Sequence, residues 1–86
     1  EPNILEQFQL LNGYSIIQME VPDSFVDNSL LELNLRREYG VECLAIKSKN
    51  DSSQQVIPSA DIHLKRHDSI ILLAPNENIN QIKSIR

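Results

Sequence analysis

This chain is poor in the residues that carry covalent and metal chemistry. It has one cysteine, Cys43, two histidines and no tryptophan in 86 residues. A single cysteine cannot close a disulfide within the chain, which fits a reducing compartment. Glycine occurs only at Gly13 and Gly40, so the chain has no glycine-rich phosphate loop and no dinucleotide fingerprint. No serine–histidine–aspartate pattern or paired acid stands out, and the sequence therefore predicts a protein that is not an enzyme.

Positive charge and long apolar runs are also scarce. Eight Lys and Arg face twelve Asp and Glu, which gives a net charge of −4. Nucleic-acid backbones require a dense positive field, so this balance argues against a nucleic-acid partner. No apolar run approaches the roughly 20 residues that cross a bilayer, and no signal peptide opens the chain. A single domain of this size buries only about 60% of its unfolded surface, and self-association would cover more.

The first segment is predicted to be a connector. Residues 1–13 begin without an initiator methionine, and we interpret them as a linker from a missing upstream domain. Apolar residues at helical spacing predict a short docking helix over residues 3–11, namely Ile4, Leu5, Phe8 and Leu11. Asn12 and Gly13 would end it. Residues 14–21 then alternate as a strand with one apolar face.

The rest of the chain alternates between helix and strand signals. Ser29 and Glu32 form a capping box that begins a helix, and Gly40 would end it. Strands are predicted over residues 41–47, 54–57, 62–64 and 69–74, followed by a helix over residues 76–86. The expected fold class is α+β: a small β-α-β-β-β-β-α domain over residues 14–86 with a mixed sheet.

The order and spacing of these elements resemble a known family. They are similar to the C-terminal lobe of bacterial regulators of potassium conductance, called RCK_C or TrkA-C. The resemblance rests on the following residues: Ser29-Leu30, Glu32-Leu33, Arg36, Tyr39-Gly40-Val41, Leu44-Ala45-Ile46, Pro58, Asp68, Ile79 and Ile82. The family commonly has Gly-Lys where Asp27-Asn28 stand, and glycine where His67 and Ala74 stand.

The resemblance implies a regulatory role in the cytoplasm. It implies a homodimer formed through the helix-end and strand face, within a gating ring that acts on a membrane cation transporter subunit at the inner face of the membrane. It implies no direct membrane insertion and no resident cofactor. Some family members bind cyclic di-AMP between two such lobes. The corresponding ligand-binding positions here would be Leu30, Leu31, Asn34, Leu35, Arg36, Glu42 and Pro58.

Several alternatives stay open at this point. Glu42 stands where the family places an amide, and it could instead pair with Arg36 or Arg37. The chain would then be a purely structural dimerisation lobe without a small-molecule ligand, or a lobe appended to an antiporter or a transcription regulator. Cys43 is expected to be a small core residue. His63 and His67 do not point to a metal site, because a strand-to-turn spacing does not aim both rings at one point.

Overall fold

The domain is built on one five-stranded antiparallel sheet. A computed structural model describes residues 3–86, so Glu1 and Pro2 of the predicted connector lie outside the described residues. The strand order is β1-β2-β5-β3-β4. The strands are β1 (Ile4–Leu11), β2 (Tyr14–Glu20), β3 (Glu42–Lys47), β4 (Gln54–Val56) and β5 (Ser69–Pro75). The α-helices are α1 (Leu30–Leu33), α2 (Leu35–Tyr39) and α3 (Ile79–Lys83), and the 3-10 turns are η1 (Asp23–Phe25) and η2 (Asn76–Asn78).

The segment predicted to be a docking helix is a strand, and that prediction is wrong. Strand β1 pairs antiparallel with β2, and Leu11 lies opposite Tyr14. Asn12 and Gly13 form the two-residue turn between them, with Gly13 at a φ of 85°. Asn-Gly between two apolar runs is a strong hairpin signal. This signal outweighs the helical spacing of the apolar residues, because β1 pairs with β2 from Ile4 to Leu11, with two irregularities in register.

The α+β class is confirmed, although the sheet is antiparallel at each described pairing and not mixed. Strands β2 and β3 run in the same direction, and the two short helices lie between them in the sequence. Strand β5 inserts between them and pairs antiparallel with both. The two strands that run in the same direction are therefore separated by one antiparallel strand, and the sheet has no parallel pair among the described residues.

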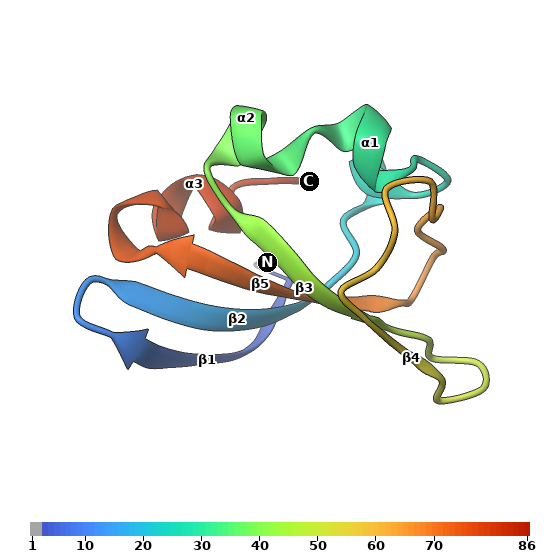
Figure 1. Cartoon of the computed structure of the whole chain (residues 1–86), viewed down its shortest axis with the longest axis horizontal. Coiled ribbons are helices and arrows are strands. Elements are labelled where there is room, and N and C mark those ends of the chain that lie inside the picture. Colours follow the sequence, from blue (N-terminus) through green and yellow to red (C-terminus); the bar gives the residue numbers. More distant parts are fainter. Residues whose placement is uncertain (1–2) are drawn as a thin grey trace.

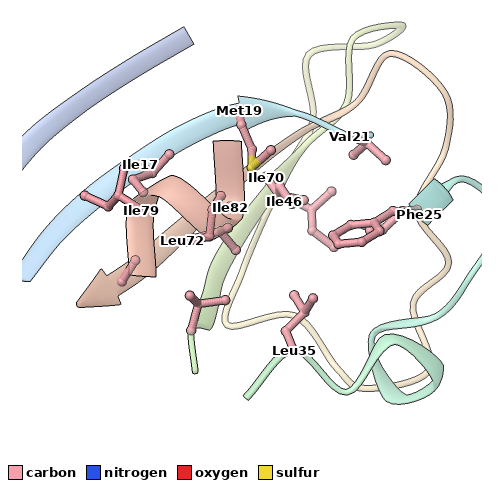
Figure 2. Packing of buried hydrophobic residues seen from close by; sticks show 13 residues of the cluster. Ile17, Met19, Val21, Phe25, Leu35, Ile46, Ile70, Leu72, Ile79 and Ile82 are labelled. Carbon is pink, nitrogen blue, oxygen red and sulfur yellow. The ribbon is translucent and has the colours of Figure 1, made fainter. Parts of the chain in front are cut away.

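One face of the sheet carries the core, and the α-helices lie on that side (Figure 1). Ser15, Ile17 and Met19 of β2 are buried, as the predicted alternation requires, whereas the residues between them are only partly covered. Figure 2 shows Ile17 and Met19 meeting Ile70 and Leu72 of β5 and the side chains of the covering helices. The buried hydrophobic residues are Ile17, Met19, Val21, Phe25, Leu35, Val41, Ile46, Leu64, Ile70, Leu72, Ala74, Ile79 and Ile82.

Three other predicted elements are shorter than expected. The helix after Ser29 breaks at Asn34, which adopts a left-handed conformation between α1 and α2. The predicted strand over residues 62–64 is reduced to a single bridge between Ser29 and His63. The C-terminal helix has five residues after the η2 turn. Among residues 3–86, no helix is long and apolar enough to cross a membrane.

Candidate functional site

A surface groove brings together the residues that the sequence singled out. It lies beside the two short helices, the start of β3 and the segment after β4, and its volume is about 350 Å³. The seven predicted site residues all line it: Leu30, Leu31, Asn34, Leu35, Arg36, Glu42 and Pro58. Their role in ligand binding stays a prediction.

The first wall of the groove is formed by α1 and α2. The Ser29 hydroxyl accepts a hydrogen bond from the Glu32 backbone at 3.1 Å, and the Glu32 carboxylate accepts one from the Ser29 backbone at 2.8 Å. This capping box confirms the predicted helix start. Asn34, at φ 49° and ψ 54°, then redirects the chain so that both short helices contribute side chains to the same wall.

The second wall begins where α2 turns into β3. Gly40 ends α2 at a φ of 67°, and its amide donates to the carbonyl of Arg36 at 3.0 Å. Glycine reaches this left-handed conformation without the strain that a Cβ atom would cause. The tight turn returns the chain to the groove, so Glu42 at the start of β3 lies next to Arg36 on α2.

The segment after β4 closes the groove on its remaining side. Ile57 has a φ of 52°, unusual for a β-branched residue, and its amide donates to the carbonyl of Leu44 at 2.8 Å. Pro58 follows directly and lines the groove. The carbonyl of Ala60 accepts a hydrogen bond from the amide of Leu31 at 2.9 Å, which ties this segment to α1.

The two charged residues of the groove pair with each other. Arg36 donates from Nε at 3.0 Å and from Nη2 at 2.6 Å to the same oxygen, Oε1 of Glu42. The side chains are 83% and 50% exposed, respectively. The pairing is one of the alternatives that the sequence left open. An exposed ion pair of this kind contributes at most about 1 kcal/mol, so a competing anion can open it.

Three further residues line the groove and were not predicted to do so: Val41, Cys43 and Ala60. Val41 and Cys43 flank Glu42, so their position in the sequence was the available signal. Burial, with a smaller contribution from the Glu42 charge, raises the pKa of the Cys43 thiol to about 11. The thiol is therefore protonated at neutral pH, and it donates weakly to the carbonyl of Ala45 at 3.5 Å.

The two histidines face different partners. His63 Nδ1 lies 3.1 Å from the Asp61 carbonyl, whereas His67 Nδ1 lies 3.1 Å from Glu20 Oε2. Within residues 3–86, no group of three His, Cys, Asp or Glu side chains is arranged to hold a metal ion.

The basic turn next to His67 is paired with acidic residues near η1. Lys65 Nζ lies 3.8 Å from Asp27, and Arg66 Nη1 lies 2.9 Å from Asp23. These cations lie away from the groove and do not join its lining.

A curated potassium uptake protein is similar to this chain. Ktr system potassium uptake protein A of Bacillus subtilis (strain 168) is 24% identical over 84 residues. The match covers 98% of this chain and 37% of that protein, so the chain spans little more than a third of its relative.

Solved structures share the fold. The RCK C domain of the potassium transport protein KtrA, determined in complex with cyclic diadenosine monophosphate, has a TM-score of 0.74 and 22% identity, covering 84% of this chain and 82% of that one. The GsuK channel bound to NAD gives a TM-score of 0.77 and 18% identity, covering 86% of this chain and 14% of that one. The TrkA-C domain family matches residues 16–85, which is most of the sequence. This match confirms the family that the capping box, the Gly40 turn and the groove residues resembled: the chain belongs to the TrkA-C domain family.

Proposed function

We propose that this domain is a regulatory lobe of a cytoplasmic potassium-transport regulator, and that a cyclic dinucleotide binds in its groove. The name of the Bacillus subtilis relative and the cyclic diadenosine monophosphate complex of the KtrA domain support this class of function. In this proposal two copies meet around a two-fold axis, and one molecule of cyclic di-AMP lies between their grooves. The parent assembly would be a gating ring that acts on a membrane cation transporter subunit.

The single observation that carries the proposal is the composition of the groove. An arginine stands at the edge of a mainly apolar lining that includes Leu30, Leu35 and Pro58. A guanidinium donates paired hydrogen bonds to phosphate oxygens, and each charge-assisted bond contributes about 1.5–3 kcal/mol. The apolar wall suits the face of a purine. The phosphate of a cyclic dinucleotide would thus contact the arginine, and its purine base would contact the apolar wall.

Ligand binding would act by population shift. A ligand bound between two lobes changes the equilibrium between two inter-lobe arrangements only by its difference in affinity for them. The connector of residues 1–13, which contains β1, would pass that change to the rest of the regulator.

Calorimetry on the domain tests the proposal. We expect saturable binding of cyclic di-AMP at one ligand per two chains, with weaker or no binding of cyclic di-GMP, ATP and NAD. Arg36→Ala should abolish binding, whereas Arg37→Ala removes the same charge from the adjacent exposed position outside the groove and should leave it intact. At 100 times its dissociation constant, the ligand should add about 2.7 kcal/mol to the free energy of unfolding. A dimeric domain without heat or thermal shift at 100 µM ligand would refute cyclic di-AMP as the ligand.

A second candidate function is a dimerisation lobe without a small-molecule ligand. The Arg36–Glu42 pair favours it, because the cation that would hold a phosphate already has a partner. Sedimentation separates the two functions. In this second case the domain is dimeric, Arg36→Ala leaves the dimer unchanged, and no nucleotide alters the dimerisation constant.

A further inference from the structure

The guanidinium of Arg36 offers Glu42 the edge that a phosphate would use. Its Nε and Nη2 atoms form one side of the planar fork, and both donate to Glu42 Oε1, at 3.0 and 2.6 Å. Paired donors on one edge are the arrangement by which arginine binds carboxylate or phosphate oxygens. A phosphate approaching this edge therefore meets a carboxylate that occupies the same donors.

The chain builds this contact locally. Arg36 lies in α2, Gly40 turns the backbone in a left-handed conformation, and Glu42 begins β3 six residues after its partner. Among the described residues that line the groove, these two carry the formal charges at neutral pH, so the pair makes the groove electrically neutral. A small anion entering it would find no net attraction.

The pair is strong enough to compete and weak enough to open. Both side chains are substantially exposed, and exposed pairs contribute at most about 1 kcal/mol, a factor of about five in affinity. A simple anion gains little by exchanging one carboxylate for itself. A ligand that also buries a ring against Leu30, Leu35 or Pro58 gains apolar contacts that a simple anion lacks.

We propose that Glu42 is an intramolecular competitor for the anion-binding edge of Arg36, and that it sets the binding energy that any anion must exceed to occupy the groove. The groove rejects simple anions and admits phosphate esters that carry an apolar or aromatic group. The ligand class rests on the proposed function, whereas the competition itself is a property of the free domain. Removing the carboxylate should open the site to phosphate in any form.

The test compares wild type, Glu42→Gln and Glu38→Gln. Glutamine at position 42 keeps the size of the side chain and removes its charge. Glu38 lies exposed in α2 outside the groove lining, so its substitution removes the same charge without touching the site. The three proteins are titrated with cyclic di-AMP and with inorganic phosphate, by calorimetry and by two-dimensional NMR. We expect Glu42→Gln to bind both more tightly than wild type, by up to about fivefold for each Arg36 that the ligand contacts. Glu38→Gln should stay within about twofold of wild type.

A ligand-free readout keeps the two proposals distinguishable. The Nε–H resonance of Arg36 should shift between wild type and Glu42→Gln, and should be unchanged in Glu38→Gln. Equal affinities of wild type and Glu42→Gln for cyclic di-AMP would overturn the competitor and leave the proposed function intact. Binding by Glu42→Gln alone would support the competitor and overturn cyclic di-AMP as a ligand of the native domain. If Glu42→Gln binds neither probe more tightly than wild type, or the Nε–H resonance does not move, the competitor is refuted.

Discussion

The side-chain amide of Asn78 donates a hydrogen bond to the carbonyl of Tyr39 at 3.0 Å, which joins the start of α3 to the end of α2. The same amide nitrogen lies 2.7 Å from the place where a Cβ atom at Gly40 would stand. Asn78, which is distant in the sequence, therefore packs against the turn between α2 and β3 and leaves room only for glycine at position 40.

We expect Gly40→Ala to lower the free energy of unfolding by about 2 kcal/mol or more, because it combines left-handed strain with a steric conflict at Asn78. Gly13→Ala is the matched control. Its φ is 85°, but no atom lies within 4 Å of its added Cβ, so only the strain of about 1 kcal/mol applies. Urea unfolding measures both variants. Equal losses would show that the Asn78 contact places no steric limit on the turn.

The capping box at Ser29 gives a prediction with a pH dependence. Ser29→Ala should cost about 1 kcal/mol at neutral pH. Hydrogen bonds from the Ser29 backbone and side chain hold the pKa of Glu32 below its ordinary value. The folded state thus favours the carboxylate, and this contribution is complete above pH 4.5 and lost as the pH falls through the folded pKa.

Denaturant unfolding between pH 7 and pH 3 measures this loss. The stability difference between wild type and Glu32→Gln should shrink towards pH 3. Glu38→Gln serves as the control, because Glu38 takes no part in the capping box. A difference that stays constant with pH would contradict the role of the Glu32 carboxylate.

Ile57 offers a stabilising substitution. This residue is 85% exposed and adopts a φ of 52°, where a β-branched side chain is strained and asparagine is tolerated. We expect Ile57→Asn to raise the free energy of unfolding by about 1 kcal/mol. Val56→Asn, at a neighbouring position that is 70% exposed and lies within β4, should be neutral or destabilising. A loss of stability in Ile57→Asn would show that the side chain has a packing role.

The Cys43 thiol should be slow to react at neutral pH. Its pKa of about 11 leaves almost no thiolate below pH 9, so its iodoacetamide alkylation rate should rise with a midpoint near pH 11. The unfolded thiol has a pKa near 9.0, so the folded state holds the proton more tightly. The resulting stability is complete below pH 9 and is lost as the pH rises through about 11. Comparison with Cys43→Ala isolates this loss, and an alkylation midpoint near 9 would contradict the burial of the thiol.

The elements near the groove could be predicted because their signals are local. Ser29 with Glu32 and the glycine at position 40 each fix a helix end within a few residues. The groove residues followed from the family resemblance. The sequence left open whether Glu42 pairs with Arg36 or Arg37, and the structure shows the pair with Arg36.

Other features depend on contacts between distant segments. The apolar residues of segment 4–11 fit a helix by spacing, and the hairpin turn at Asn12–Gly13 with the pairing to β2 decides for a strand. Strand β5 inserts between β2 and β3, and the sequence of no single strand indicates which strands it pairs with. The break at Asn34 and the left-handed Ile57 depend on how α1 and the segment at Ala60 fit together.

Strand β1 contributes none of the thirteen buried core side chains, and only Ile4 packs against them in part. It is held to the domain by its ladder with β2, which begins at Ile4 opposite Met19 and ends at the Asn12–Gly13 turn. Tension applied to the N-terminal end of β1 would load the hydrogen-bonded pairs between β1 and β2 one after another, starting at Ile4. The strand would detach at low force while the remainder stays folded. Mechanical unfolding of the domain would therefore begin by sequential rupture of β1 and not by a single cooperative event.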